Sequence, residues 1–487
     1  MFSLFSKKTN SLKKLPLLRF HNTFSGNLEV FTPLSKKEVK MYNCGPTVYG
    51  TQHIGNMRAA VFADTLRRTF GVWGYDVKQV INITDFGHLS SDADDGEDKM
   101  SLGLKKEGMA LTLANMRKLA EKYTQEYFND IQALGVPLEK IQFPRASDYI
   151  PEQISLIQAL EEKGYAYLTE QGVYYDVSRF PAYGKLGNIN LVGQREGARV
   201  QENTHKRGPF DFILWKSDKK LGWKSPWGLG FPGWHIECTA MIFKLLGRQI
   251  DIHTGGIEHI PVHHNNEIAQ AEAASGKRFV GYWLHNDHIT IEGKKIAKSL
   301  GNTVYLHNIV DKGMSAYALR YWFLTAHYRT PANFTWDALE GSATALARLT
   351  RAYLELPDGG KPDQTFLKTF YTAAADDLDT PGALAKVWDF VKVDGKYKDT
   401  SPADKKATLA EVDKLLGLGL IDARPSSRLA VLEESDLPDH VQKFLAEREE
   451  ARKNKDFAKA DELRKEIEQL GFEVKDTSEG AKVSKKD

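Results

Sequence analysis

The sequence has no long hydrophobic run and almost no cysteine. Among its 487 residues, no apolar stretch approaches the roughly 18 residues that a membrane-spanning helix needs, so we expect no contact with a membrane. Only two cysteines occur, Cys44 and Cys238, which excludes a disulfide framework and favours the reducing cytoplasm. The formal net charge is only +2, which neither requires nor excludes a nucleic-acid partner, because binding depends on where Lys and Arg cluster.

Two common catalytic patterns are also missing. The HExxH pattern of many zinc proteases does not occur, and neither does the GxxxxGK[ST] loop that holds phosphates in P-loop proteins. If the chain binds ATP, it must therefore hold the nucleotide by another device. We find no internal repeat and no low-complexity segment that would indicate a repeat protein or a disordered one.

The first pattern that is present consists of a strand, a helix and a second strand. Residues 39–43 and 77–83 are short apolar stretches typical of strands, and a helix is predicted between them from about Asn56 to Trp73. The apolar face of this helix is made of residues three or four positions apart, namely Ala59, Phe62, Leu66, Phe70 and Trp73. The pattern predicts a β-α-β unit of a parallel sheet, with a ligand site at the carboxyl ends of the strands.

The rest of the chain divides into an insertion, a second half of the sheet and a helical end. Residues 144–224 contain short strands broken by Gly and Pro, which we interpret as an insertion between two halves of a nucleotide-binding fold. Helices are expected at 235–246 and 263–275, with strands near Ile250 and Trp283. From residue 304 the chain is mainly helical, and Asp456 is a suitable N-cap for its last helix.

Four side chains form a candidate metal site. Cys44 ends the first strand, and Cys238 lies in the segment GWHIEC. His263 and Glu267 are four residues apart and therefore share one face of a helix. Two thiolates, one imidazole and one carboxylate are a plausible set of zinc ligands. The spacing alone leaves an alternative open, in which the cysteines are small buried apolar groups and the histidines have structural roles.

Two further motifs suit a triphosphate. The HIGN segment, residues 53–56, lies where the first strand leads into the first helix, and a helix N-terminus offers free N–H groups and partial positive charge. The KIAKS segment, residues 295–299, carries two lysines that can neutralise a triphosphate while its α-phosphate is attacked. Taken alone, each motif is better explained as a turn or a solvated cluster of charge.

The two motifs in this order, around an insertion, resemble the signature motifs of class I aminoacyl-tRNA synthetases. With CGPTVY at 44–49, GWHIEC at 233–238 and HHNNE at 263–267, the chain resembles cysteinyl-tRNA synthetases from about Leu18 to its C-terminus. The resemblance implies an α/β fold with a Rossmann-like catalytic domain, an inserted domain and helical C-terminal domains. The implied division is an N-terminal tail at 1–17, catalytic halves at 18–143 and 226–303, a connective insertion at 144–225, a stem-contact region at 304–342, a tRNA-binding helical bundle at 343–430, and a helical hairpin with a tail at 431–487.

The same resemblance implies roles for particular residues. The zinc-ligand positions fall on Cys44, Cys238, His263 and Glu267. The catalytic and ATP-binding positions fall on His53, Asn56, Lys295 and Lys298, with Gly55 as a further ATP contact. The positions that line the amino-acid pocket fall on Gly45, Thr47, Thr84 and Trp234. The implied cofactors are one Zn2+ per chain and Mg2+ that accompanies ATP.

The chain departs from the family pattern at two places. The second motif usually reads KMSKS, and here Ile296 and Ala297 replace its Met and first Ser, which changes the packing of the loop and removes one hydroxyl group but keeps both lysines. The metal segment usually reads HHENE, and here Asn265 stands in its middle while the ligand positions are unchanged.

The resemblance implies a monomeric cytoplasmic enzyme that activates L-cysteine with ATP and attaches it to the 3′ end of tRNA(Cys). A pocket that reads shape alone separates cysteine from serine only about a hundredfold. A thiol titrates near ~8.5 and a hydroxyl resembles water at about 15.7, so their acidities differ by roughly 7 units, or at most about 10 kcal/mol. We therefore expect zinc to select the substrate as a thiolate, without the help of an editing domain.

Contact with tRNA is expected near the end of the chain, although a solvated helix face is the alternative. The basic residues that crowd this end are Arg448, Arg452, Lys453, Lys455, Lys459, Lys482, Lys485 and Lys486. The first 28 residues contain five basic residues and no acidic one, which is compatible either with an organelle transit peptide or with a short basic tail.

Three other functions remain compatible with parts of the pattern. A ligase of the same superfamily that joins activated cysteine to an amino sugar would share the zinc and ATP motifs, but it would lack a long helical end. A zinc hydrolase would need a water-activating base and neither ATP motif. A catalytically inactive RNA-binding relative would show damage at the ligands or lysines, and none is found.

Overall fold

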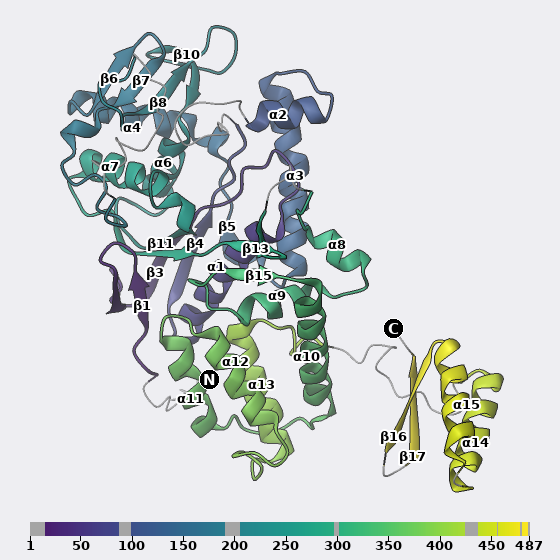
Figure 1. Cartoon of the computed structure of the whole chain (residues 1–487). Helices are drawn as coiled ribbons and strands as arrows, with labels where there is room; N and C mark the ends of the chain where they lie inside the picture. Colours follow the sequence, from purple (N-terminus) through teal and green to yellow (C-terminus); the bar gives the residue numbers. More distant parts are fainter. Residues whose placement is uncertain are drawn as a thin grey trace, which may run out of the picture.

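A parallel sheet lies at the centre of the fold (Figure 1). In the computed structural model, which describes residues 15–86, 99–189, 205–296, 301–423, 437–454, 456–477 and 480–485, five strands pair in the order β12-β11-β3-β4-β5. Their bounds are Glu38–Asn43 for β3, Asp76–Ile81 for β4, Ile141–Gln142 for β5, Ile250–Gly256 for β11 and Val280–Asn286 for β12. All of these pairings are parallel.

The predicted β-α-β unit is confirmed. Helix α1, Ile54–Val72, connects β3 to β4 and buries Leu66 and Phe70 of the predicted apolar face. Strands β3 and β11 are direct neighbours although they belong to different halves of the chain, so the two halves of the catalytic fold meet between them. The strand order reverses at this point, which is where open α/β sheets bind their ligands.

The insertion forms an antiparallel sheet at one end of the molecule (Figure 1). Its order is β6-β7-β8-β10-β9, with bounds Ala166–Thr169, Gly172–Tyr175, Phe212–Ser217, Gly228–Pro232 and Trp223–Ser225 respectively. The sheet shares one apolar core with the helices α4, Ile150–Glu162, α6, Trp234–Leu245, and α7, His263–Ser275. The two helices expected after the insertion are thereby confirmed as α6 and α7.

The helices and strands that the sequence analysis did not single out lie beside the sheet. Helix α2 spans Lys99–Lys106, and the long helix α3 spans Leu113–Ala133 and begins at an N-cap, Thr112, whose side chain accepts from the N–H of Asn115 at 3.1 Å. A small sheet of order β14-β13-β15 contains Ile289–Ile291 as β13, Lys294–Lys295 as β14 and Ala332–Phe334 as β15. This sheet supports the segment that carries the predicted lysine motif.

A helical region follows, as predicted. Its helices are α8, Leu306–Asp311, α9, Ala316–Leu324, α10, Trp336–Glu355, α11, Gln364–Ala375, α12, Thr380–Val391, and α13, Pro402–Leu416. Helices α10 to α13 form the bundle at the end of the molecule opposite the insertion (Figure 1). Their buried residues, such as Phe366 and Leu409, belong to the same apolar core as Val61 of α1, so the bundle packs directly on the catalytic part.

The C-terminal residues fold around a small core of their own. Helices α14, Asp439–Lys453, and α15, Phe457–Gln469, precede an antiparallel hairpin of β16, Phe472–Thr477, and β17, Gly480–Lys485. Asp456 is confirmed as N-cap of α15, because its side chain accepts from the N–H of Lys459 at 3.1 Å. The expectation of a plain tail after the last helix is wrong, because residues 472–477 and 480–485 form strands that bury Phe472, Val474 and Val483.

None of the helices in the described part of the chain has the length and hydrophobicity that a membrane crossing requires.

Candidate metal centre and active site

The four predicted metal ligands meet at the carboxyl ends of β3 and β11. The donor atoms of Cys44, Cys238, His263 and Glu267 all lie within 4.8 Å of one another. His263 Nε2 is 2.9 Å from Glu267 Oε1 and 3.7 Å from Cys238 Sγ. Cys44 is half-buried and the other three residues are buried, so the cluster has one side that is closer to the surface.

Regular structure places each of these donors. Cys44 follows β3 directly, and its N–H donates to the carbonyl of Thr254 in β11 at 2.9 Å. Cys238 lies in the first half of α6, and α7 begins at His263 and presents Glu267 one turn later. The ligands therefore come from one sheet edge and two helices, and their relative positions are fixed by the core that these elements share.

Further histidines, which the sequence analysis did not single out, surround the cluster. His253 Nε2 lies 3.0 Å from Glu267 Oε2, and His264 Nε2 lies 3.2 Å from Cys44 Sγ. His264 Nδ1 is in turn 2.7 Å from His285 Nε2. Together with Cys44 and Glu267, His253 and His264 form a second group of four whose donor atoms also lie within 4.8 Å of one another. The doublet of histidines at the start of α7 was a signal for His264, whereas the role of His253 depends on the register of β11 and could not be seen.

The electrostatics of the cluster favour the charged forms of Glu267 and Cys44, whereas the hydrogen bond with Cys44 and burial raise the pKa of the Cys238 thiol well above its usual value. Burial opposes ionisation of Glu267, but the charges of His253 and His263 hold the pKa of this carboxyl at about 2. At Cys44, burial is outweighed by the hydrogen bond from Cys238 and by the charge of His264, so the pKa of this thiol lies well below its usual range. A carboxylate and a thiolate beside a second thiol and an imidazole form a donor set that fits zinc.

The residues predicted to line the amino-acid pocket border this cluster. Trp234, the first residue of α6, stacks on His263 with ring centroids 4.1 Å apart. Thr84 Oγ1 donates to Glu237 Oε2 at 2.9 Å and accepts from Asn82 Nδ2 at 3.2 Å. Asn82, Thr84 and Glu237 are all buried, so this chain of hydrogen bonds joins the segment after β4 to α6.

The turn after Cys44 closes against the same residues. The N–H of Gly45 donates to Asn82 Oδ1 at 2.8 Å, and Thr47 pairs with Thr84 in an isolated bridge. A Cβ atom at Gly45 would lie 1.7 Å from the carbonyl oxygen of Asn82, so only glycine fits at this position. The structure thus brings Gly45, Thr47 and Thr84 together, next to the first metal ligand in the chain.

The HIGN motif forms the start of α1. His53 is the N-cap, its Nδ1 accepts from the N–H of Gly55 at 3.1 Å, and its own N–H donates to Asn56 Oδ1 at 3.2 Å. The N–H groups of Ile54 and Asn56 donate to the carbonyls of Val304 and His53. The expectation of free N–H groups at this helix start is therefore wrong for residues 54–56, because those of Gly55 and Asn56 bond to His53 and that of Ile54 bonds to Val304.

The lysine motif begins on an exposed hairpin. Lys295 is exposed on β14, and the preceding turn holds Glu292 and Gly293 at positive φ of +49° and +73°. Asn302 Nδ2 donates to the carbonyl of Lys295 at 3.0 Å and so links the two ends of the motif. Lys298 lies outside the described residues, and its predicted contact with ATP stays a prediction.

The two motifs are neighbours in space. His53 pairs with Tyr305, which follows the lysine motif, in an isolated bridge. Ile296 Cδ1 lies 3.7 Å from the place that a Cβ atom of Gly55 would take. Segments that are far apart in the sequence thus meet at the amino end of α1.

Arg58 holds these segments in place, and the sequence analysis missed it. Its guanidinium donates to the carbonyls of Asp287 and His288 at 3.0 Å, of His327 at 3.0 Å and of Thr330 at 2.8 Å. Burial lowers the pKa of Arg58 to about 10, against the opposing charge of Asp287. One side chain of α1 therefore fixes the chain that leads into the lysine hairpin.

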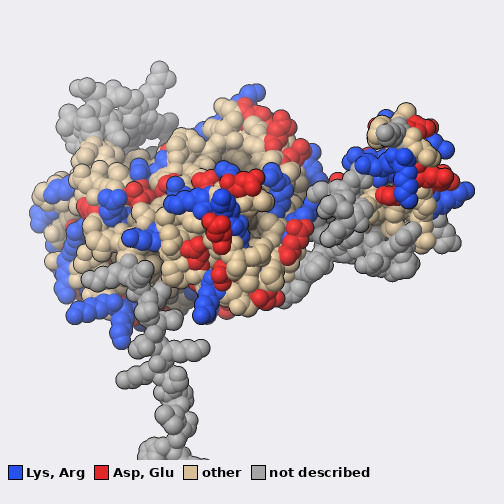
Figure 2. Space-filling view, turned by 90° about the horizontal axis from the view of Figure 1, so that it is seen from below, with Lys and Arg blue, Asp and Glu red and all other residues tan. Residues whose placement is uncertain are grey.

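The predicted basic surface at the C-terminal end is present in part. Arg452, Lys453 and Lys459 are exposed around the end of α14 and the start of α15, and Figure 2 shows basic side chains gathered on this unit beside acidic ones. Arg448 is only 2% exposed, so the expectation that it contributes to this surface is wrong. Lys455, Lys486 and the side chains of Lys482 and Lys485 lie outside the described part of the structure.

Comparison with known proteins defines the class. Residues 30–344 match the family model of the class I (C) tRNA synthetase catalytic domain. Mycobacterium tuberculosis methionyl-tRNA synthetase in complex with methionyl-adenylate superposes with a TM-score of 0.54 at 15% identity, over 80% of this chain and 92% of that chain. The Agrobacterium radiobacter K84 LeuRS–tRNA–LeuAMS complex gives 0.55 at 12% identity, over 80% and 84%. The fold is that of a class I aminoacyl-tRNA synthetase.

The sequence relatives define the family within this class. Residues 434–483 match the cysteinyl-tRNA ligase anticodon binding domain. The cysteine--tRNA ligase 1 of Burkholderia lata is 44% identical over 472 residues, which cover 96% of each chain. A cysteine--tRNA ligase of Thermus thermophilus is 42% identical over 479 residues, which cover 95% of this chain and 98% of the relative. The chain belongs to the cysteine--tRNA ligase family.

Proposed function

We propose that this protein activates L-cysteine with ATP and transfers it to the 3′ end of tRNA(Cys), and that zinc at the Cys44 cluster selects the cysteine as a thiolate. The observation that carries the proposal is the position of the cluster. Its four donors lie within 4.8 Å of one another, His263 stacks on Trp234, and Thr84 donates to Glu237, the neighbour of Cys238 in the chain. The relatives that cover nearly the whole chain bear the same activity in their names.

Cys44, Cys238, His263 and Glu267 would hold the zinc ion. Zinc bound there would supply a Lewis acid with an affinity for soft sulfur. A serine hydroxyl is too weakly acidic to lose its proton and bind the metal in the same way. The chain's own contribution is rigidity. Trp234 stacks on His263, and His253 lies 3.0 Å from Glu267 Oε2. These contacts keep the donors from moving to accommodate a substrate that has a hydroxyl in place of the thiol.

In the activation step the cysteine carboxylate attacks the α-phosphorus of ATP, and pyrophosphate leaves with the bonding electron pair. His53 and Asn56 would orient the triphosphate at the start of α1, and Lys295 with Lys298 would neutralise the charge that develops on it, together with Mg2+. We assign no general base. A carboxylate is already the nucleophile, so alignment and charge neutralisation are sufficient for this step.

In the transfer step a ribose hydroxyl at the 3′ end of the tRNA attacks the activated carboxyl group and AMP leaves. The proposed tRNA contacts are the stem-contact region at 304–342, the bundle at 343–430 and the anticodon-binding end. Arg452, Lys453 and Lys459 are exposed on that end and would pair with phosphates.

Charge reversal at Arg452 should weaken tRNA binding and flatten its dependence on salt, while amino-acid activation is unaffected.

The proposal is tested by ATP–pyrophosphate exchange on the zinc-loaded full chain, with cysteine or serine as substrate and with or without a strong chelator. We expect exchange with cysteine, none above background with serine, and loss on chelation that zinc restores. Subsequent charging of tRNA(Cys) but not of an amino sugar would establish the acceptor. Exchange that persists after complete removal of zinc would refute the role of the metal.

A further inference from the structure

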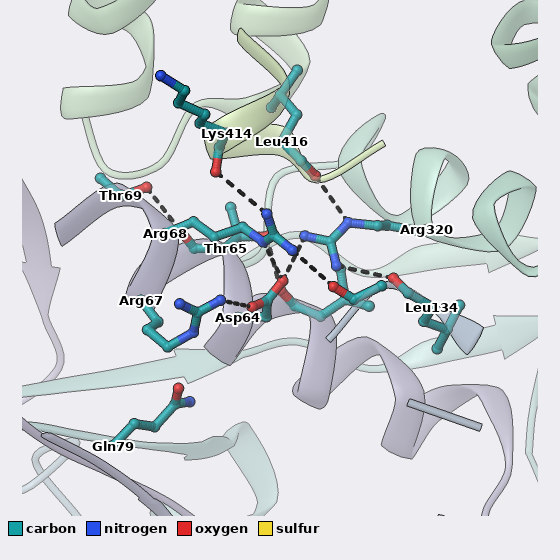
Figure 3. A network of polar contacts seen from close by, with 12 residues as sticks. Asp64, Thr65, Arg67, Arg68, Thr69, Gln79, Leu134, Arg320, Lys414 and Leu416 are labelled. Carbon is teal, nitrogen blue, oxygen red and sulfur yellow. Dashed lines mark hydrogen bonds and ion pairs between the residues drawn. The ribbon is translucent and has the colours of Figure 1, made fainter. Parts of the chain in front are cut away.

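A buried carboxylate of α1 binds three arginines where the catalytic part meets the helical bundle (Figure 3). The carboxylate of Asp64 accepts from Arg68 Nε at 2.6 Å and from Arg320 Nη2 at 2.8 Å, and it also pairs with Arg67. The side chains of Asp64 and Arg320 have no exposed surface. Because Arg320 belongs to α9, this ion pair joins two helices from different parts of the chain.

Besides binding Asp64, Arg320 donates hydrogen bonds to the ends of two other helices. Its Nε donates to the carbonyl of Leu416, the last residue of α13, at 2.9 Å, and its Nη1 donates to the carbonyl of Leu134, the C-cap of α3, at 3.0 Å. Carbonyls at helix C-termini lack partners within their own helix and carry partial negative charge. A single guanidinium therefore satisfies the ends of α3 and α13 and the carboxylate of α1.

Arg68 makes a parallel connection. It donates to the carbonyl of Gly135, just after α3, at 2.7 Å, and to that of Lys414 in α13 at 3.4 Å. Gly417 closes α13 at a positive φ of +63°, and a Cβ atom there would lie 2.6 Å from Arg320 Nη2. The end of α13 thus approaches the arginines so closely that it accepts no side chain.

The position of this network in the chain indicates its purpose. Helix α1 begins with the HIGN motif, and α13 is the last described helix before the segment 434–483 that matches the anticodon-binding domain. The network therefore connects the element that starts the ATP site with the end of the bundle from which the chain leads to the anticodon-binding end. We propose that Asp64, Arg68 and Arg320 are positioning residues for the transfer step, which keep the helical bundle, a proposed tRNA contact, in register with the active site.

This inference rests on the proposed function, because only transfer requires both ends of the protein to act on one tRNA. Activation needs the metal cluster, the pocket and the two ATP motifs, and none of the contacts described for those sites involves Asp64, Arg68 or Arg320. Weakening the network should therefore separate the two steps. A purely structural role would lower both steps together, in proportion to the folded fraction.

The experiment compares three variants of the zinc-loaded full chain, Asp64→Asn, Arg68→Gln and Arg67→Gln. Arg67 is the matched control, because it pairs with the same carboxylate from the same helix and its ion pair does not reach α3 or α13 within the described residues. ATP–pyrophosphate exchange measures activation, and kcat/KM for tRNA(Cys) charging measures transfer. We expect Asp64→Asn and Arg68→Gln to lower charging at least tenfold with exchange within twofold, and Arg67→Gln to change both by less than twofold.

Several outcomes would overturn the inference. Equal losses of exchange and charging would show that the network only stabilises the fold, and unchanged charging in Arg68→Gln would show that it positions nothing. Arg68 is 18% exposed, so this variant decides the matter even if Asp64→Asn does not fold. Exchange without any charging of tRNA(Cys) by the unaltered protein would refute the proposed function itself, before the variants are compared.

Discussion

The metal cluster and the lysine hairpin serve the same proposed reaction but are built in opposite ways. The donors of the cluster come from β3, α6 and α7, lie within 4.8 Å of one another and are held by a second layer of histidines. Lys294 and Lys295 are both exposed, on a strand of only two residues. The cluster is thus mostly buried among its neighbours, whereas the two lysines of the hairpin are exposed.

The difference follows from what each region has to do. Selecting sulfur over oxygen requires donors that cannot rearrange around the wrong substrate, and burial among packed helices provides this. Neutralising a triphosphate requires positive side chains that reach a large, flexible ligand and let the product leave afterwards. Lysines on an exposed hairpin can do both. Loss of a side chain should therefore affect metal binding and folding in the cluster, but only catalysis in the hairpin.

The largest effect is expected for Cys238→Ser. This change removes one of the two thiolate donors from a buried position, so we expect zinc affinity and cysteine-dependent exchange to fall by more than ~100-fold, beyond the range typical of losing an outer partner. Zinc content after dialysis against a chelator measures the first effect. As the matched change in the outer layer, His253→Gln should lower zinc affinity by about 10- to 100-fold. A Cys238→Ser variant that retains zinc as firmly as the unaltered protein would contradict this description of the cluster.

The second-largest effect is expected at the buried ion pairs of Asp64, away from the metal cluster and the lysine hairpin. Burial raises the pKa of Asp64, but Arg320, Arg68 and Arg67 more than compensate and hold it at about 2. Against an unfolded value near 3.9, the ionised carboxylate contributes about 3 kcal/mol, which is present above pH ~4 and lost as the pH falls towards 2. Urea unfolding should therefore show that the stability gap between the unaltered protein and Asp64→Asn narrows between pH 5 and pH 2. A gap that stays constant over this range would contradict the assigned charge.

A smaller effect is expected for Lys295→Ala in the hairpin. Loss of one positive charge near the phosphates should reduce exchange about tenfold, or ~1.4 kcal/mol in the barrier. The free energy of unfolding should change by no more than ~0.5 kcal/mol, because the side chain is exposed. Lys294→Ala is the control, because successive residues of a strand point to opposite faces. If both variants lose exchange equally, the position of Lys295 has no special role.

The smallest effect is expected for Ile296→Met, which restores one residue of the usual family motif. Ile296 is partly buried against the main apolar core and lies beside Gly55, and methionine fills a similar volume. We expect exchange to change by less than about threefold, measured at saturating and at low ATP. A tenfold gain would show that this departure from the motif limits the enzyme.

The features that the sequence predicted are those that depend on local periodicity or on recognised motifs. The β-α-β unit, the helices α6 and α7 and the N-cap Asp456 were visible in this way. The resemblance to the family predicted that Cys44 and Cys238 share one site, although nothing in their spacing required it.

The features that the sequence did not predict depend on contacts between distant segments. Arg58 looks like any surface residue of a helix until the carbonyls of 287–288 and 327–330 are placed around it. The same holds for Asp64 and Arg320, whose pairing depends on the packing of α9 against α1. The hairpin of β16 and β17 was missed because residues 472–485 are rich in charge and contain few of the apolar residues that mark a strand.

The most direct test of the central claim is the near-ultraviolet absorption spectrum of the protein with Co2+ in place of zinc, recorded before and after addition of cysteine or serine. Thiolate ligands of cobalt give a charge-transfer band whose intensity grows with their number. We predict that cysteine increases this band by about half, as expected when a third thiolate joins Cys44 and Cys238, and that serine leaves it unchanged. A spectrum that cysteine does not alter, or that serine alters equally, would contradict the selection of the substrate through its sulfur.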